Sequence, residues 1–453
     1  MMKKFFGTDG IRGEVGKYPI TPNTAMHLGY AAGRVLRNEM DDSKRALVLI
    51  GKDTRISGYM FESALEAGFS AAGVDIGLLG PMPTPAVAYL TRTLRADAGV
   101  VISASHNPFQ DNGFKFFSAN GAKLSDKWEL EVERFMDESM ETVPSLQLGK
   151  ARRIDDAPGR YIEFCKSSLP LGFSLHGIKL VLDCANGASY ATAPAIFEEL
   201  GAEVVTIGDQ PDGVNINREV GSTYPELLAE QVKSEQADFG IALDGDGDRC
   251  IMTTKDGKIV DGDLLLYIIA RSRQNQQSLS GPVVGTLMSN LGVEHALKKM
   301  GVNFMRSDVG DRYVLEMLQQ NGGTIGGESS GHILCLDRTT TGDGVVSALQ
   351  VLFEIVESGK TLEELVSEVT LYPQVMVNVK VAQRGLPNSE VIDKAIKESE
   401  SILGDRGRVL LRASGTEPLI RVMVEGESMD EVEVVVEELA AVVRKEVGKT
   451  EAI

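Results

Sequence analysis

The chain has 453 residues, which at ordinary domain sizes is enough for about three or four domains that each bury a core. Hydrophobic residues make up 43% of it and no apolar run is long enough for a membrane span, while the start of the chain lacks the apolar segment of a signal peptide. The formal net charge of −19 argues against binding of nucleic acid or of an anionic membrane, because the field of the protein would repel phosphate polymers. We therefore expect a cytoplasmic protein in which local cations meet any phosphorylated ligand.

The four cysteines lie far apart, and no pair has the Cys-x-x-Cys spacing of a zinc or redox site. We expect buried thiols rather than a disulfide or zinc framework. The glycine-rich turns also differ from the common nucleotide motifs, because GKDTR at 51–55 lacks the upstream glycine of a phosphate-binding loop and no GxGxxG opens a first helix. ATP and NAD sites are therefore disfavoured.

Strand-like apolar runs alternate with helical patterns at 45–117, at 178–257 and at about 260–368. This alternation predicts β-α-β units and mostly parallel sheets. We therefore predict an α/β protein in which three similar α/β domains have mixed or parallel sheets. These domains are expected at residues 1–155, 156–257 and 258–371.

The pattern changes after Tyr372, where strands pair locally. Two strand-like stretches, at 374–382 and 408–426, precede a long helix that begins near Ser428. This order predicts a smaller C-terminal α+β domain over 372–453. No Pro-rich or low-complexity linker separates the four domains, so the sequence defines each boundary only to within a few residues.

A serine stands at the end of a buried strand in GVVISASHNP, residues 99–108. Ser105 makes a poor triad nucleophile, because adjacent side chains diverge and His106 could not easily act as its base. A serine that carries a phosphoryl group needs less from its neighbours, since phosphoryl transfer depends on positioning and on charge neutralisation by a metal and cations. Taken alone, the stretch is better explained as a Ser/Asn turn closed by Pro108.

Three aspartates alternate with glycines in DGDGDR at 244–249, directly after the apolar strand FGIAL. In an extended loop alternate side chains point the same way, so Asp244, Asp246 and Asp248 would converge on one point. Three converging carboxylates favour a hard divalent cation, and Mg²⁺ suits such oxygen ligands. A calcium EF-hand is excluded because its sixth position would be Arg249 rather than glycine. A solvated acidic turn remains the alternative.

Hydroxyls, glycine and arginines are concentrated in RASGTEPLIR at 412–421, between two strands. They offer a dianion several hydrogen-bond donors and two positive charges. The donors are Arg412, Ser414, the amides around Gly415, Thr416 and Arg421. A hairpin turn flanked by surface arginines is the alternative.

A second glycine-bounded loop, GGESSGH at 326–332, places three polar side chains on alternate positions. Glu328 and Ser330 suit neighbouring sugar hydroxyls, and His332 could shuttle a proton. A buried histidine with satisfied hydrogen bonds explains His332 equally well.

Together these four loops resemble those of the α-D-phosphohexomutase family, where they occur in the same order. SASHNP matches the phosphoserine loop, DGDGDR the metal loop, GGESSGH the sugar-binding loop and RASGTEP the phosphate-binding loop. The resemblance covers essentially the whole chain and implies four domains in a heart-shaped arrangement around a central cleft. FGTDGIRG near the N-terminus and VGDRYV at 309–314 resemble the bacterial branch that acts on glucosamine phosphates.

The resemblance also implies roles for individual residues. Ser105 would be the phosphorylated nucleophile, and Glu328 with Ser330 would bind sugar hydroxyls. The ligands of Mg²⁺ would be Ser105, Asp244, Asp246 and Asp248. Residues near the reacting hydroxyl and phosphate would be Arg12, Lys115 and His332, with Arg249 directly after the metal loop. The substrate's non-reacting phosphate would be held by Arg412, Ser414, Gly415, Thr416 and Arg421.

The implied reaction moves a phosphoryl group between O6 and O1 of glucosamine phosphate, through phosphoserine at Ser105 and a 1,6-bisphosphate. Glucosamine or glucose 1,6-bisphosphate would act as primer, and the product would feed synthesis of UDP-N-acetylglucosamine and cell-wall precursors. Expected partners are the small-molecule substrate and neither nucleic acid nor membrane, while the oligomeric state stays open, with a homodimer as one expectation. Two other classes stay open: a Mg²⁺-dependent phosphomonoesterase, which would release phosphate steadily, and a non-catalytic sugar-phosphate sensor.

Overall fold

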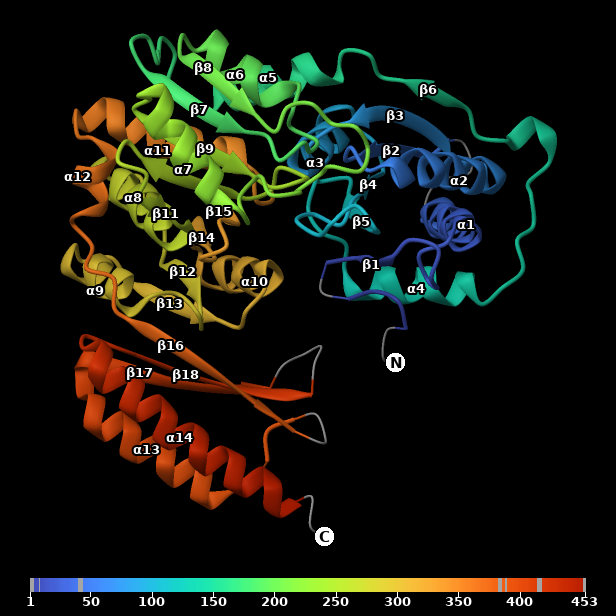
Figure 1. Cartoon of the computed structure of the whole chain (residues 1–453). Coiled ribbons are helices and arrows are strands. Elements are labelled where there is room, and N and C mark those ends of the chain that lie inside the picture. The colour runs from blue at the N-terminus through green and yellow to red at the C-terminus, as the bar shows by residue number, and fades with distance from the viewer. Residues whose placement is uncertain are drawn as a thin grey trace.

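The computed structural model describes residues 4–7, 9–39, 44–381, 385–387, 389–413 and 418–450, with side chains up to residue 447. Four sheets follow one another along the chain, each with its own helices (Figure 1). We name each sheet with its helices as units I to IV in chain order. Three α/β units precede a smaller antiparallel α+β unit, which confirms the predicted fold class. The residue boundaries predicted between the domains stay predictions.

Unit I has a six-stranded sheet in the order β1-β5-β4-β2-β3-β6, in which β5 runs antiparallel to both of its neighbours. Its strands are β1 (Ile11–Glu14), β2 (Leu47–Lys52), β3 (Asp75–Pro81), β4 (Ala98–Ile102), β5 (Asp111–Ser118) and β6 (Ala151–Arg153). Its helices are α1 (Pro22–Asn38), α2 (Ile56–Ala72), α3 (Thr84–Thr93) and α4 (Asp126–Met136), with a 3₁₀ turn, η1 (Ser145–Gln147). Gly68 allows helices α1 and α2 to approach closely, because a Cβ atom at this position would lie only 2.1 Å from the Met26 carbonyl oxygen.

Unit II has a five-stranded sheet in the order β11-β10-β9-β7-β8. Its strands are β7 (Lys179–Asp183), β8 (Glu203–Ile207), β9 (Phe239–Leu243), β10 (Cys250–Thr254) and β11 (Ile259–Val260). Its helices are α5 (Ala157–Ser167), α6 (Thr192–Glu199) and α7 (Pro225–Glu235). Strands β9 and β10 form an antiparallel hairpin in which every residue is buried, so the short loop between them is held from both ends.

Unit III has a four-stranded sheet in the order β13-β12-β14-β15. Its strands are β12 (Val283–Thr286), β13 (Phe304–Ser307), β14 (Ile325–Gly327) and β15 (Ile333–Cys335). Its helices are α8 (Gly262–Asn275), α9 (Leu291–Lys299), α10 (Asp311–Asn321), α11 (Gly344–Ser358) and α12 (Leu362–Val366). The side chains of Asp261 and Asp343 cap α8 and α11 by accepting backbone N–H groups of the first turn.

Unit IV has a three-stranded antiparallel sheet in the order β16-β18-β17. Its strands are β16 (Gln374–Lys380), β17 (Gly407–Ala413) and β18 (Leu419–Gly426). Its helices are α13 (Glu390–Leu403) and α14 (Met429–Thr450), with a 3₁₀ turn, η2 (Gly404–Arg406). Both helices cover one face of the sheet, and the other face is turned toward the rest of the molecule (Figure 1).

The clusters of buried hydrophobic residues show which units share side-chain contacts, and unit I has one such cluster of its own. One cluster of buried residues runs through units I, II and III, including Val87 of α3, Leu180 of β7 and Leu349 of α11. Unit IV has a separate core made of its own residues. It contacts unit III through polar contacts, such as those of Arg408 with the carbonyl oxygens of Leu287 and Ser289.

All four cysteines are buried free thiols. None of the helices within the described ranges combines the length and the hydrophobicity required to cross a bilayer.

Candidate active site

Ser105 follows β4 in a loop and has a positive φ of 51°, a left-handed conformation that is uncommon for serine. Its side chain is almost completely buried, with the residue 2% exposed. The hydroxyl donates to Asp244 Oδ2 over 2.6 Å, which joins the serine loop of unit I to the aspartate loop of unit II. The predicted nucleophile and the predicted metal loop are therefore in direct contact.

The position of His106 corrects one expectation. Its Nδ1 lies 3.3 Å from Ser105 Oγ, although adjacent side chains were expected to diverge. The left-handed backbone at Ser105 accounts for the difference, because it departs from the extended geometry assumed for this stretch. Burial, together with Arg249 and Arg12, lowers the pKa of His106 to about 4, so its ring is neutral near pH 7.

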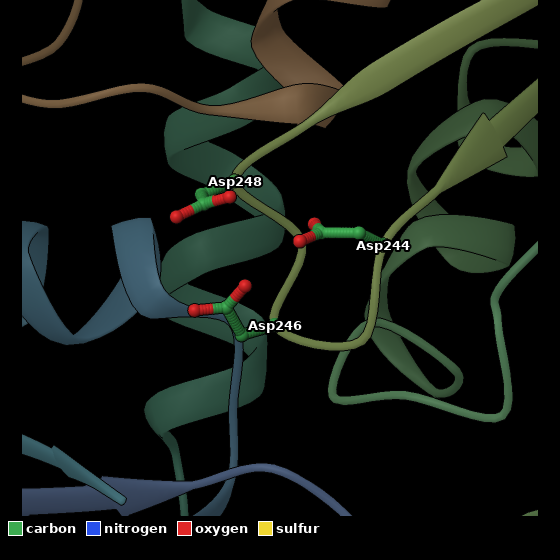
Figure 2. Close-up of side chains that lie close together, drawn as sticks. All are labelled: Asp244, Asp246 and Asp248. Carbon is green, nitrogen blue, oxygen red and sulfur yellow. The ribbon is translucent and has the colours of Figure 1, made fainter. Parts of the chain in front are cut away.

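The three aspartates lie on the loop between β9 and β10 and gather around a common space (Figure 2). Each offers an oxygen within 4.8 Å of the others, and all three residues are buried. Burial and the two neighbouring carboxylates raise the pKa of Asp244 well above its usual range. Oδ1 of Asp246 and Oδ1 of Asp248 have no hydrogen-bond partner among the described residues. Buried, mutually repelling carboxylates with free oxygens fit a divalent cation.

Lys115 of β5 reaches this loop from unit I. Its Nζ lies 2.9 Å from Asp246 Oδ2, 3.1 Å from Asp248 Oδ2 and 3.0 Å from Asp9 Oδ2. Burial alone would lower the pKa of Lys115, but these carboxylates outweigh it and raise the pKa well above its usual range. Lys115 is therefore a fixed positive charge beside Ser105 and the metal loop.

Charged side chains of units I, II and III alternate in sign around a closed ring. Lys123 Nζ lies 2.7 Å from Asp9 Oδ1 and 2.5 Å from Asp311 Oδ2. The two ring nitrogens of His332 each lie 3.6 Å from a carboxylate oxygen, one of Asp311 and one of Asp248. In order, the ring consists of Asp248, Lys115, Asp9, Lys123, Asp311 and His332.

His332 is buried, as expected for a histidine of the protein interior, and it also lines the cavity of the site. Burial would lower the pKa of His332, but Asp248, Asp311 and Glu328 outweigh it and raise the pKa to about 9. The ring is therefore protonated near pH 7 and can donate a proton. Nε2 makes no hydrogen bond within the described part of the chain.

A cavity of about 460 Å³ opens between these groups. Its cationic side is formed by Arg12, which lies 3.5 Å from Asp9, and by Arg249, whose backbone N–H donates to Asp244. Ser105 lies in its wall. The residues that line it are Phe5, Gly7, Asp9, Gly10, Arg12, Ser105, Asp248, Arg249, Val309, Gly310, Asp311, Glu328 and His332. The volume and the charges suit a sugar phosphate.

The predicted sugar-binding loop connects β14 and β15 of unit III. Glu328 is half-buried, lines the cavity and accepts the Gly310 N–H at 3.0 Å through Oε1. This bond ties the loop to the VGDRYV stretch. Ser330 is half-buried in the same turn but is not one of the residues that line the cavity.

The two predicted phosphate-binding arginines face each other in unit IV. Arg412 of β17 is paired directly with Arg421 of β18 in the antiparallel ladder. Burial and the charge of Arg421 lower the pKa of Arg412, and Arg412 Nε has no hydrogen-bond partner among the described residues. Two like charges directly opposite each other are unfavourable, so the pair favours an anion. Neither arginine lines the cavity, and Ser414, Gly415 and Thr416 lie outside the described residues.

Several residues of the site were not identified from the sequence. Asp9 and Asp311 stand inside the quoted stretches FGTDGIRG and VGDRYV, so those motifs were the available signal. Lys123 and Thr84 have no such signal. Thr84 donates its hydroxyl to Asp246 Oδ2 at 2.6 Å, a contact between residues that are far apart in sequence.

Family models of the phosphoglucomutase/phosphomannomutase domains match four segments of the chain. The alpha/beta/alpha domains I, II and III match residues 3–143, 160–257 and 261–372, and the C-terminal domain matches residues 376–442.

Individual proteins match over nearly the full length. The phosphoglucosamine mutase of Nitrosococcus oceani is 60% identical over 449 residues, 99% of this chain and 99% of that protein. A solved structure of a phosphoglucomutase/phosphomannomutase family protein from Burkholderia thailandensis has a TM-score of 0.81 at 25% identity, over 97% of both chains. The N-acetylphosphoglucosamine mutase of Aspergillus fumigatus, solved with GlcNAc-6P and magnesium, has a TM-score of 0.68 at 18% identity, over 98% of this chain and 96% of that one, and supports the fold alone.

Proposed function

Because this chain belongs to the phosphoglucomutase/phosphomannomutase family, we propose that it interconverts glucosamine 6-phosphate and glucosamine 1-phosphate. The curated relative of Nitrosococcus oceani is a phosphoglucosamine mutase, which supports this choice of sugar. The contact that carries the chemistry is the 2.6 Å hydrogen bond from Ser105 Oγ to Asp244, because it places a serine against a carboxylate cluster suited to a cation.

The proposed enzyme begins with a phosphoryl group on Ser105. In the first step the bond from phosphorus to Ser105 Oγ breaks and a bond from phosphorus to a substrate hydroxyl oxygen forms, which gives glucosamine 1,6-bisphosphate. The substrate hydroxyl loses a proton and Ser105 Oγ gains one, and we assign this proton transfer to His332. Lys115 keeps its positive charge throughout and neutralises charge on the transferred phosphoryl group. After the bisphosphate turns over, the reverse step returns its other phosphate to Ser105.

Other residues of the site hold the substrate in this scheme. Arg12 and Arg249, on the cationic side of the cavity, neutralise the reacting phosphoryl group. Glu328 and Ser330 bind sugar hydroxyls. The non-reacting phosphate is bound by Arg412, Ser414, Gly415, Thr416 and Arg421. The direct pairing of Arg412 with Arg421, with no hydrogen-bond partner for Arg412 Nε among the described residues, supports this last assignment.

One buried oxygen each of Asp246 and Asp248 accepts no hydrogen bond from the described residues, and these oxygens fit a divalent cation. We assign Mg²⁺ to Asp244, Asp246 and Asp248, with an oxygen of the group on Ser105 as a further ligand. A Mg²⁺ ion bound there supplies Lewis-acid stabilisation of the charge on the transferred phosphoryl group.

Glucosamine or glucose 1,6-bisphosphate primes Ser105, and the substrate is a free hexosamine phosphate rather than a nucleic acid or a membrane. The enzyme acts in the cytoplasm, with a homodimer as the expected assembly, and its product feeds synthesis of UDP-N-acetylglucosamine and cell-wall precursors.

The test is replacement of the nucleophile. We expect Ser105→Ala to abolish turnover of glucosamine 6-phosphate with little change in melting temperature, because Ser105 lies in a loop and only its hydroxyl is removed. Peptide mapping of the wild-type enzyme after priming with glucose 1,6-bisphosphate should place the phosphate on Ser105. Ser70→Ala is the matched control, since the Ser70 hydroxyl donates to the Gly149 carbonyl oxygen away from the cavity.

An active Ser105→Ala variant with phosphate on another residue would overturn the assignment. Steady release of inorganic phosphate would support the phosphomonoesterase instead, and binding without covalent phosphate would support the sensor. In competition at equal concentrations, glucosamine phosphates should have a higher kcat/KM than glucose or mannose phosphates. A preference for glucose or mannose phosphates would keep the mutase mechanism and change its substrate.

A further inference from the structure

Hydrogen bonds fix both the N–H group and the carbonyl group of Ser105, whose positive φ is an unfavourable conformation for serine. Its N–H donates to Ser103 Oγ at 2.9 Å, and the Ser103 hydroxyl donates to the buried carboxylate of Asp53 at 2.5 Å. Its carbonyl oxygen accepts from Arg55 Nη2 and from Asn217 Nδ2, each at 2.9 Å. None of these bonds uses Ser105 Oγ, so all of them can persist when the hydroxyl carries a phosphoryl group.

Arg55 is completely buried and uses its whole guanidinium group in this region. Nε donates to Asp53 Oδ2 at 2.8 Å, and Nη1 and Nη2 donate to carbonyl oxygens of the serine loop and of the start of β5. These carbonyls belong to Ser105, Asn107, Pro108 and Asp111. The planar fork of arginine can satisfy all these acceptors at once, whereas a lysine ammonium has only three N–H groups. The buried ion pair of Arg55 with Asp53 need not add to the free energy of unfolding, because desolvation of both charges offsets their attraction. The many contacts of Arg55 with the serine loop indicate instead that it positions that loop.

Asn217 brings the second donor from unit II. It lies between β8 and α7 with a φ of 57°, and its amide donates to the carbonyl oxygens of Ser105 and Asn107, the same two that Arg55 Nη2 contacts. A Cβ atom on Gly245 of the metal loop would lie 2.6 Å from both Ser105 O and Asn217 Nδ2. The Ser105 carbonyl therefore rests against the metal loop, and Asn217 secures it there.

We propose that Arg55 and Asn217 are positioning residues for phosphoryl transfer. They hold the Ser105 backbone against the metal loop, so that Oγ keeps its place beside Asp244 before and after each transfer. Neither residue lines the cavity, so they act through Ser105 rather than on the sugar. The inference rests on the proposed function, because it concerns a serine that is phosphorylated in every cycle.

The test removes the Asn217 amide in two ways. Asn217→Gly deletes it without backbone strain, because glycine adopts this φ readily, and Asn217→Asp keeps the size but loses the donor. We expect kcat to fall by about tenfold to a hundredfold in both variants with KM for glucosamine 6-phosphate unchanged, since a small misplacement of a reacting group has this effect. Phosphorylation of Ser105 by glucose 1,6-bisphosphate in a single turnover, followed by intact mass, should slow by the same factor.

Glu219→Gly is the matched control. Glu219 lies in the same loop, is exposed and has a φ of 58°, so this change alters the loop backbone in the same way without touching the serine loop. We expect wild-type kcat and phosphorylation rate from it.

Wild-type rates in both Asn217 variants, or an equal loss in the control, would overturn the positioning role. A rise in KM with kcat unchanged would also overturn it, because it would place Asn217 in substrate binding. If the wild-type protein took up no phosphate at all, the proposed function would fail as well. The wild-type measurement therefore separates failure of the function from failure of this inference.

Discussion

Two arginines of unit IV, Arg412 and Arg421, lie directly opposite each other, and no ion pair to an acid is found for either within the described residues. Like charges in directly opposed positions of an antiparallel pair destabilise the sheet. The arrangement is therefore better explained by a ligand than by stability. A phosphate dianion between the two side chains would turn the repulsion into two charge-assisted contacts.

This arrangement predicts opposite effects of Arg421→Ala on binding and on stability. Substrate affinity should fall by about tenfold to a hundredfold, because a charge-assisted contact contributes about 1.5–3 kcal/mol. The melting temperature should stay level or rise, because the repulsion with Arg412 is removed. Inhibition constants, kinetics in both directions and melting curves measure these effects.

Arg444→Ala is the control, because Arg444 lies on α14 and its side chain is largely exposed. If Arg421→Ala slowed only one direction of the reaction, a phosphate site shared by both substrate orientations would be wrong.

Residues of the site could be predicted from the sequence where all members of a functional group lie within one short stretch of the chain. Asp244, Asp246 and Asp248 were found because their spacing in a loop brings them together. Lys123 and Asn217 were not found, because their partners are more than a hundred residues away or in another unit. A single lysine or asparagine has no local pattern that separates it from the many on the surface.

At the level of elements, the first turn of α8 contains a buried acid outside the active site. Asp263 Oδ2 accepts the Asn290 N–H at 2.8 Å, while Oδ1 has no partner among the described residues. Burial, with the charge of Asp261, raises the pKa of Asp263 to about 7 from its ordinary value of 3.8. The folded chain therefore holds this proton more tightly than the unfolded chain.

The sign of the resulting pH dependence follows from linkage. A raised carboxyl pKa favours the folded state at low pH, and that advantage is lost as the pH rises from about 4 to about 7. Asp263→Asn cannot ionise, so the stability of the variant relative to wild type should rise by up to about 1.4 kcal/mol for each pH unit in this window. Melting curves of both proteins at about pH 5 and about pH 8 measure the change.

Asp238→Asn is the control, because Asp238 is exposed and accepts the backbone N–H of Lys179. A difference between the Asp263→Asn variant and wild type that is the same at both pH values would show that Asp263 is ionised alike in the folded and unfolded chains.

Elements with a clear apolar pattern were predictable, and elements without one were not. The fully buried strand β9 and the strand pair β17 and β18 follow the predicted stretches. Strand β6 pairs with β3 although all of its residues are exposed, so no alternation of apolar and polar residues could reveal it. Sheet order also depends on contacts between distant segments, which a single sequence does not display.

At the scale of the whole molecule, units I to III share one hydrophobic cluster and one ring of charges, in addition to a second cluster that belongs to unit I alone, whereas the cluster of unit IV contains no residue of the other units. The alternating strand and helix pattern predicted three similar units but could not show that they share a core. That property depends on side chains from different units meeting in space. The ring adds ionic contacts between units I and III, centred on Lys123.

Lys123→Ala should therefore weaken the contact between units I and III. The side chains of Asp9 and Asp311 are 27% and 17% exposed, so removal of the lysine leaves two poorly solvated carboxylates on facing units. We expect the melting temperature to fall by at least about 2 °C. Adding Asp311→Asn should restore part of the loss, because one of the two charges is then absent.

Lys17→Ala removes a pair with Glu14 whose side chains are both largely exposed, and it should change the melting temperature little. Equal losses from Lys17→Ala and Lys123→Ala, or no recovery in the double variant, would contradict a bridging role for Lys123.

The cavity is lined in part by residues near the N-terminus of the chain, such as Arg12, whereas the arginine pair lies near the C-terminus. The two parts of the site are therefore made at different times during synthesis on the ribosome. At about 5–20 residues per second, tens of seconds separate the making of Arg12 from that of Arg421. A nascent chain can assemble the shared core of units I to III, with the serine and the aspartates in place, while the arginine pair is still missing. A premature stop codon between residues 373 and 421 would therefore leave units I to III complete, with a serine that could carry phosphate, but without the arginine pair that binds the far phosphate of the substrate.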